Sequence, residues 1–273
     1  MKTLFLTTLL LATPATAGPL PDIQSVTADF VQADWMTVWG AEWLLEDHQA
    51  AAIPVLLSLL DRDEVVKLEN TIDLIYPGAE TFYGHGYIVS YDLDYLPARA
   101  GWALEELTFE SFGFEDPVVT HEQLRAPALE GKMDVPMEEI SPQPDPASRK
   151  ARFAAATGKA KAWWKARNGK WSRLAALRAA LSSGDSWRQM KALVWLRSGT
   201  SRCDGLDLAS FKTEIRPLAE KLAQSGNPSV AQQAGYLLRE GDSWYWHKTD
   251  PSYRYGSEDG VFSGITPKRP PGM

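Results

Sequence analysis

The stretch IPVLLSLLDRDEVVKLENTIDLIYPG, residues 53–78, decides the fold predicted for this chain. In its first half, apolar residues recur at i, i+3, i+4 and i+7, the spacing that puts them on one helix face. These residues are Ile53, Leu56, Leu57 and Leu60. The proline near the start is compatible with a first helical turn, where backbone N–H groups have no partner within the helix.

The second half of this stretch repeats the pattern after a short polar turn. Its apolar residues, Val65, Leu68, Ile72 and Ile75, predict another helix that ends before the Pro-Gly pair at 77–78. Residues 213–238, TEIRPLAEKLAQSGNPSVAQQAGYLL, predict a second pair of this kind. Such pairs are the units of α-solenoids, which bury a core by stacking and usually offer a surface to a partner.

Apolar spacing predicts further helices along the chain. They lie around Trp35–Leu45 with a stripe of Met36, Trp39 and Trp43, after Pro97, across 147–167, around Leu174–Leu181 and around Met190–Trp195. No window shows the sustained alternation typical of strands, and only Tyr87–Tyr91 has a strand-like composition. We therefore predict an all-α fold, a short α-solenoid of antiparallel helical pairs.

These pairs resemble HEAT and HEAT-like repeats. The resemblance is carried by Ile-Pro, spaced leucines, aspartates at the turn and a following valine pair with a lysine: Ile53-Pro54, Leu57, Leu60, Asp61, Asp63, Val65-Val66 and Lys67. The residues Arg99, Ala103, Leu104 and Leu107 are similar to the second helix of another unit, and Ile215–Leu238 to a third. Glu69, Asn70 and Thr71 depart from the pattern, where small residues are expected. The resemblance implies an architecture and no reaction.

The first 17 residues have the pattern of a cleaved export signal. Lys2 supplies positive charge, Leu4–Leu11 an apolar core, and Ala15–Ala17 a small-x-small cleavage site. The apolar run is shorter than the roughly 20 residues that span a bilayer, and no later segment reaches that length. We expect export across a bacterial inner membrane into the periplasm or beyond, and a mature chain that starts at Gly18.

Charge divides the mature chain. Residues 18–140 hold 24 acidic and 5 basic side chains, whereas residues 141–240 hold 7 acidic and 18 basic ones. The predicted order is an acidic helical region at 18–116, a proline-rich linker or long loop at 117–148, a basic helical region at 149–240 and an aromatic, irregular tail at 241–273. The two charged regions are expected to dock on each other, to face different partners, or simply to be solvated.

The residues most suited to contacting a ligand gather in one aromatic, glycine-bearing segment. They are Tyr83, His85, Tyr87, Tyr91, Asp92 and Asp94. Tyrosines offer stacking and hydroxyl contacts, and the imidazole with the two carboxylates could hold a divalent cation. The alternative is a loop whose tyrosines pack on the solenoid edge and whose aspartates cap the helix that starts at Pro97.

No other motif predicts catalysis. The four histidines lack the HExxH spacing, and no CxxC pair, nucleotide-binding glycine loop or GxSxG elbow occurs. The Gly-Asp-Ser-Trp sequence at 184–187 recurs at 241–244 and resembles the serine motif of GDSL-type hydrolases, but its context favours a helix stop and a cap. The tryptophans at 163, 164 and 171 predict core packing beside snorkelling cations. The single cysteine, Cys203, excludes an intramolecular disulfide.

These observations predict a non-catalytic, exported binding scaffold that is monomeric, has a protein partner and needs no cofactor or metal. Acidic composition and export argue against nucleic acid as the ligand. One alternative is a metal-dependent enzyme or ligand binder centred on His85, Asp92 and Asp94. Another is a protein that binds cell-wall carbohydrate through exposed aromatic side chains.

Overall fold

The computed structural model describes residues 20–72, 74–79, 81–82, 87–116, 135–136, 145–198 and 201–240. In these ranges the chain is mostly helical, which confirms the predicted class at that level. The predicted signal at 1–17, most of the predicted linker at 117–148 and the predicted tail at 241–273 lie outside the described residues. None of the helices in the described ranges combines the length and apolar character that crossing a membrane requires.

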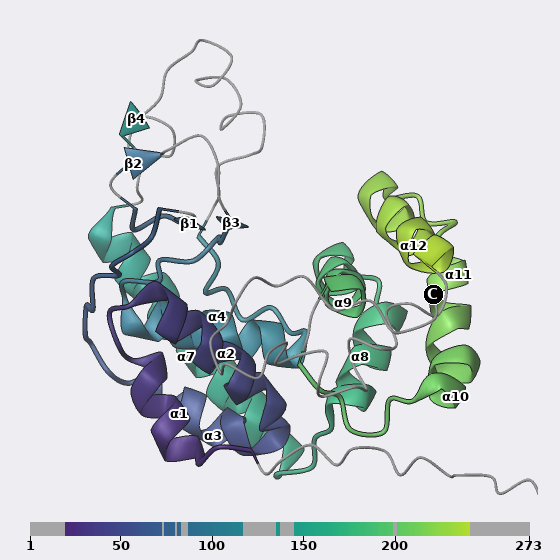
Figure 1. Cartoon of the computed structure of the whole chain (residues 1–273), viewed down its shortest axis with the longest axis horizontal. Helices are drawn as coiled ribbons and strands as arrows, with labels where there is room; N and C mark the ends of the chain where they lie inside the picture. The colour runs from purple at the N-terminus through teal and green to yellow at the C-terminus, as the bar shows by residue number, and fades with distance from the viewer. Residues whose placement is uncertain are drawn as a thin grey trace, which may run out of the picture.

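The acidic half builds the first of two helical groups, on the left of Figure 1. Its helices are α1 (Ile23–Phe30), α2 (Trp35–Asp47), η1 (Gln49–Ala51), α3 (Ala52–Leu59) and α4 (Leu96–Thr108). The long helix α7 (Pro146–Arg167) belongs to the basic half of the sequence but packs against α3 and α4. Together these helices enclose one continuous apolar core.

Local sequence explains how these helices begin and pack. Asp22 caps α1, a helix that was not predicted, by accepting hydrogen bonds from the backbone N–H groups of residues 24 and 25. The predicted buried face of α4 is confirmed. Gly101 on that helix touches the ring of Phe114 so closely that a Cβ would lie 2.1 Å from the ring's Cγ. Glycine is therefore required there for the loop after α4 to pack.

The second helix of the first predicted pair is wrong. Residues 62–72 run without helix, and two of the four apolar residues that predicted it are exposed, Val65 at 73% and Ile72 at 62%. The backbone pairs with distant segments instead: Val66 N donates to Asp94 O at 2.7 Å, and Glu69 N to Ala33 O at 2.8 Å. β-Branched residues have weak helix preference, so these long-range bonds prevail. The helix that packs against α3 in place of the predicted one is α4.

Two pairs of very short strands lie beyond this extended segment. β1 (Leu74–Ile75) pairs in parallel with β3 (Tyr87–Ile88), in the register Leu74 to Tyr87. β2 (Thr81–Phe82) pairs antiparallel with β4 (Val135–Pro136). The strand-like composition noted at 87–91 is thus used for only two residues, and β3 brings Tyr87 to the edge of the helical group.

The basic half forms the second helical group, on the right of Figure 1. It contains α8 (Arg173–Ser182), α9 (Ser186–Ser198), α10 (Leu208–Ser210), the π-helical turn η2 (Phe211–Ile215), α11 (Arg216–Leu222) and α12 (Pro228–Glu240). The residues predicted to be helical at 213–238 form η2 and α11 followed by α12, and α12 contacts α11. Helix α8 contacts α9 and α11, and α12 contacts α11 and α9, so two helix pairs lie against each other around a second core.

One aromatic residue connects the two cores. The sequence predicts that Phe109, Phe112 and Phe114 pack together on the end of α4, but the structure divides them. Phe112 and Phe114 belong to the first core and Phe109 to the second. Phe109 has a left-handed backbone, with φ of 55°, and its ring meets that of Trp195 edge-on at 5.6 Å. This turn therefore places the ring of Phe109 in the second core, while Phe112 and Phe114, which follow it, pack in the first.

Candidate functional site

The structure gives two of the predicted contact residues internal roles. Asp94 accepts hydrogen bonds from Leu68 N at 2.7 Å and Tyr76 Oη at 2.9 Å, and it lies 3.1 Å from Lys67 Nζ. Asp92 pairs with Arg149 at 3.1 Å, and burial, with the nearby charges of Asp94 and Asp116, raises its pKa despite that arginine. Both carboxylates fix the extended segment and α7 in place.

The other four residues of the predicted contact segment are Tyr83, His85, Tyr87 and Tyr91. Tyr83 and His85 lie outside the described residues. Neither aspartate caps α4, because Tyr95 stands at the N-cap without a side-chain bond, so the predicted capping role is wrong. Within the described ranges, no three His, Cys, Asp or Glu side chains have an arrangement suited to a metal ion. Tyr87 and Tyr91, in contrast, line a cleft.

This cleft, which we call the acid–aromatic cleft, has a volume of about 410 Å³. It lies where α2, the β3 segment, α4 and α9 meet, so both halves of the chain form its walls (Figure 1). Its lining combines aromatic rings, three glutamates, one lysine and a few aliphatic side chains: Trp39, Glu42, Trp43, Glu46, Tyr87, Ile88, Val89, Ser90, Tyr91, Trp102, Glu106, Lys191, Val194 and Trp195. Concave sites with apolar walls and a few converging polar groups are the usual form of a binding site.

Helix α2 supplies the chemical character of the cleft. Trp39, Glu42, Trp43 and Glu46 recur at i, i+3, i+4 and i+7, so they form one stripe along the helix. The opposite face carries the residues that are fully buried in the first core, including Val38 and Leu45. The helix predicted from the spacing of Met36, Trp39 and Trp43 is confirmed as α2. Met36 is 41% exposed, however, and α2 has a core face and a separate acid–aromatic face.

Stacked rings fix the positions of the aromatic side chains at the mouth of the cleft. Trp39 stacks on Trp35 with ring centroids 5.7 Å apart and meets Trp43 edge-on at 5.0 Å. It also contacts Tyr87 of β3 at 5.2 Å. Tyr87 is 56% exposed, so this end of the cleft is open to solvent. Contacts of this kind hold the rings in place before any ligand arrives.

At the base of the cleft, Glu46 reaches the second helical group. Its carboxylate lies 2.8 Å from Nη2 of Arg173, a residue of α8 that has no exposed surface. Ser201 completes the contact by accepting hydrogen bonds from Arg173 Nη1 at 2.7 Å and Trp195 Nε1 at 2.9 Å, and by donating one to Glu46. A buried ion pair needs such additional bonds to offset its desolvation. The negative charge of Glu46 is therefore matched.

A second ion pair crosses the cleft beside it. Lys191 of α9 contacts Glu106 of α4, and its ammonium lies 5.4 Å from the ring centroid of Tyr91. Burial lowers the pKa of Lys191, but Glu106 and the neighbouring acids outweigh that effect, and the net shift is upward. Lys191 is therefore charged, and Glu106 is matched as well.

Glu42 differs from its two neighbours. It is only 3% exposed, and no lysine or arginine of the described ranges forms an ion pair with it. Burial raises the pKa of Glu42 well above its usual value, and the charges of Glu46 and Glu106 raise it further, against an opposing effect of Arg173. Strongly shifted groups in clefts mark candidate functional sites. Such a carboxyl can donate or accept a hydrogen bond, or meet a positive charge brought by a ligand.

The same ionic pattern holds the two halves together outside the cleft. Acidic groups of the first half pair with basic groups of α7 and α9: Asp61 with Lys161 at 2.5 Å, Asp63 with Lys150 at 3.0 Å, Asp116 with Arg149 at 3.1 Å, and Glu110 with Arg167 at 3.1 Å and Arg188 at 3.2 Å. Of the three expectations for the charged regions, docking on each other is thus confirmed. The tryptophans at 163, 164 and 171 pack against the first core, as predicted.

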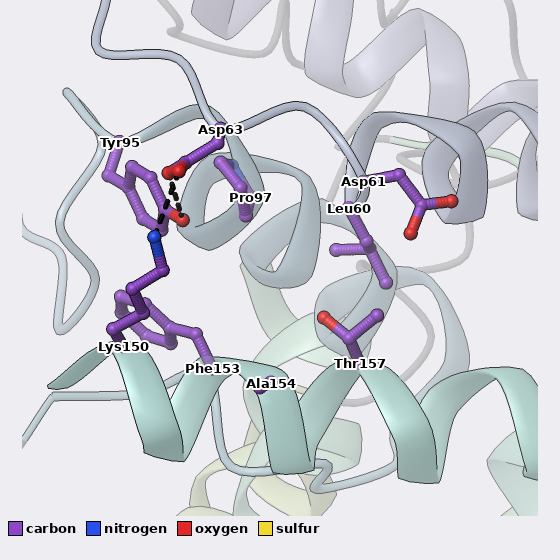
Figure 2. Close-up of a pocket in the computed structure, with 9 residues that line it drawn as sticks. All are labelled: Leu60, Asp61, Asp63, Tyr95, Pro97, Lys150, Phe153, Ala154 and Thr157. Carbon is purple, nitrogen blue, oxygen red and sulfur yellow. Dashed lines mark hydrogen bonds and ion pairs between the residues drawn. The ribbon is translucent and has the colours of Figure 1, made fainter. Parts of the chain in front are cut away.

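Figure 2 shows another hollow on this seam, between α7 and the turn after α3, with a volume of about 310 Å³. Asp63 is one of the residues that line it, and its carboxylate accepts hydrogen bonds from Lys150 of α7 and from Tyr95 Oη, the latter at 3.0 Å. The bond from Lys150, followed by that from Tyr95, lowers the pKa of Asp63. The charged groups that meet in this hollow bond to each other, so we assign it a structural role and take the acid–aromatic cleft as the candidate site.

Two smaller predictions concern single residues. Asp185 of the first Gly-Asp-Ser-Trp sequence accepts hydrogen bonds from Trp187 N at 2.9 Å and Arg188 N at 3.3 Å, which confirms the capping role of this copy. The second copy, at 241–244, lies outside the described residues. Cys203 is buried in the second core.

Comparison with known proteins gives no relative from which a function could be inferred. No family model matches the chain, no curated protein matches its sequence, and no solved structure matches its fold. The geometry of the acid–aromatic cleft therefore carries the functional argument.

Proposed function

We propose that the protein is an exported, non-catalytic binding scaffold that receives part of a protein partner in the acid–aromatic cleft. One observation carries this proposal: both halves of the chain converge on a cleft whose aromatic rings surround a buried, unmatched carboxyl group, that of Glu42. Tryptophan and tyrosine are the residues that most often anchor protein interfaces, and fixed rings lose little conformational entropy when a partner binds.

The architecture supports a scaffold. Two helix pairs of the second group lie against each other, and α3 packs on α4 in the first group. We infer from these contacts, and from the HEAT-like residues around Ile53-Pro54 and Ile215–Leu238, that the chain is a short solenoid of HEAT-like pairs. Solenoids of this kind act by presenting a surface. The leader-like residues 1–17 support export, with a mature, monomeric chain that starts at Gly18.

The alternative centred on His85, Asp92 and Asp94 has less support than binding in the cleft. The oxygens of Asp94 bond to Leu68 N, Tyr76 and Lys67, and Asp92 pairs with Arg149, so both aspartates already hold the fold together. Carbohydrate binding is the second candidate function. It is favoured by the exposed ring of Tyr87 at the mouth of the cleft, which could lie against the apolar face of a sugar.

Affinity capture with matched variants tests the scaffold proposal. The tagged mature chain is incubated with an extract of exported proteins from its native host, beside Trp43→Ala in the cleft and Ile72→Ala, an exposed apolar residue outside it. We expect one stoichiometric partner to be retained by the wild type and by Ile72→Ala, and lost by Trp43→Ala, with circular dichroism confirming that all three are folded.

Retention of the same partner by Trp43→Ala would contradict the assignment of the cleft, and the absence of any partner at low salt would contradict the scaffold. Sedimentation of the wild type with purified peptidoglycan, lost in Trp43→Ala, would replace the protein partner with a carbohydrate.

A further inference from the structure

The charges that line the acid–aromatic cleft balance only while Glu42 keeps its proton. Three glutamates face it, one from α4 and two from α2. Glu106 contacts Lys191, and Glu46 lies against Arg173, so two of the three negative charges have a positive partner. Glu42 is as deeply buried as Glu46, and its partner is not a cation but the carboxyl group of Glu46, with which it shares a hydrogen bond that helps to raise its pKa. A ligand that carries one positive charge would match the charge that Glu42 gains when it ionises.

The aromatic side chains beside Glu42 suit a particular kind of cation. Trp39 and Trp43 precede and follow it on the same stripe of α2, and Tyr87 contacts Trp39 from β3. The faces of such rings attract ammonium groups, and the attraction is stronger where water is excluded. Aliphatic side chains on the remaining wall, Val89 and Val194 among them, offer contact to an alkyl stem. A metal ion would gain nothing from these apolar surfaces.

We propose that the cleft binds an ammonium group on an alkyl chain, the lysine side chain of the protein partner, with its charge between Glu42 and the rings of Trp39 and Trp43. This inference rests on the proposed function, because it names the group that the partner places in the cleft. The negative field of the first half, which holds 24 acidic and 5 basic side chains in residues 18–140, attracts such a partner from a distance.

Binding of this cation is coupled to a proton. The charged groups that face Glu42 are Glu46 on its own helix, Glu106 on α4, Arg173 on α8 and Lys191 on α9. Burial and the two glutamates favour the protonated form, whereas a bound ammonium favours the ionised form. Glu42 therefore loses a proton when the ligand enters. Affinity for the cation should rise as pH increases through the pKa that Glu42 has in the free protein.

Titration calorimetry on the mature chain tests the proposal with a matched pair of probes. Nα-acetyl-lysine N-methylamide carries the ammonium, and the same compound acetylated at Nε is its neutral counterpart. We expect the charged probe to bind at least about tenfold more tightly. Its apparent enthalpy should change with the ionisation enthalpy of the buffer, which reports the released proton.

Two variants locate the effect. Glu42→Gln keeps the side-chain shape and should weaken the charged probe by about tenfold or more and abolish proton release. Glu220→Gln removes an exposed acid of α11 that pairs with Arg216, and should change neither. Equal binding of the two lysine probes, unchanged binding by Glu42→Gln, or tighter binding of a neutral oligosaccharide would overturn the proposal.

A free amine, n-butylammonium, separates this inference from the proposed function. Excess n-butylammonium should displace the captured partner if a lysine side chain occupies the cleft. Capture that depends on Trp43, without binding of the lysine probe or n-butylammonium, would overturn the ammonium inference and leave the scaffold standing. Tight binding of n-butylammonium by a chain that captures no partner would contradict both the scaffold and the lysine source.

Discussion

The two helical groups each contain a fully buried arginine, and the two arginines do different work. Arg99 of α4 is bonded to backbone carbonyls of its own half: Leu93 at 2.6 Å, Gln32 and Val66 at 2.8 Å, and Phe30 at 3.2 Å. Arg173 of α8 instead reaches a carboxylate and a hydroxyl, those of Glu46 and Ser201. Arg99 thus stabilises one half, whereas Arg173 joins the two.

This difference follows from the local structure around each residue. In the first half, carbonyls from three separate places converge on Arg99: the end of α1, the extended segment and the residues before α4. A guanidinium with five donors can bond to all of them at once. Burial without an adjoining ion pair lowers the pKa of Arg99 to about 10. The second half is regularly helical and needs no such device internally. Its buried arginine, Arg173, instead bonds to Glu46 of α2, a residue that lines the acid–aromatic cleft.

Replacing Arg99 should have the largest effect. Arg99→Met removes the donors to four carbonyls in or beside the extended segment, and bonds to charged groups contribute about 1.5–3 kcal/mol each. We expect the free energy of unfolding, measured by denaturant titration, to fall by at least about 4 kcal/mol. Hydrogen exchange should accelerate first in residues 62–72. A loss of less than about 1 kcal/mol would mean that water replaces the arginine.

Replacing Arg173 should have the next largest effect and a different signature. Arg173→Met leaves Glu46 buried without a counter-charge, which costs about 3–5 kcal/mol. Adding Glu46→Gln to this variant should restore part of the loss, because no unmatched charge then remains.

Arg178→Met is the matched control for that comparison, since Arg178 of the same helix pairs with Glu214 in solvent. Exposed ion pairs contribute about 0–1 kcal/mol. The ion pair between Arg173 and Glu46 would not be what joins the two halves in either of two cases: if Arg178→Met and Arg173→Met lower the free energy of unfolding equally, or if adding Glu46→Gln lowers it further.

The smallest effect concerns Glu42 and varies with pH. Its pKa in the folded state is raised above the usual value of 4.5, so its contribution to stability is present below that value and is lost as pH rises through the folded-state pKa. Glu42→Gln does not titrate and escapes this loss. We expect its melting temperature relative to the wild type to increase between about pH 5 and about pH 8. A difference that stays constant over this range would show that Glu42 is ionised at little cost.

Much of the fold could be predicted because apolar spacing is a local signal. The stripes on α4, α7 and the pair at 213–238 face the cores as expected. The opposite charges of the two halves predicted one of the structure's main contacts. The segment after Asp61 failed because its partners are distant in sequence: Ala33, Asp94 and Arg99 draw it into an extended form that apolar spacing cannot reveal.

The site was harder to predict than the fold. Tyr87 and Tyr91, proposed from the sequence as contact residues, do lie in the cleft. Asp92 and Asp94 are not part of its lining, and Tyr83 and His85 lie outside the described residues. The missed signal was the alternation of tryptophan and glutamate at helical spacing in Trp39, Glu42, Trp43 and Glu46. The spacing of Trp39 and Trp43 was used only to predict a helix, and only the fold shows that Glu106 and Lys191 come from helices on the far side of the same cleft.

Site-specific photo-crosslinking in the native host tests most directly whether the partner meets the acid–aromatic cleft. The photoreactive residue p-benzoylphenylalanine is placed at Tyr87, on the exposed rim of the cleft, and in a second chain at Val65, which is more exposed but lies outside it. We predict one strong crosslinked product from position 87 and none from position 65. A product from position 65 alone, or the same product from both positions, would contradict the cleft as the binding site.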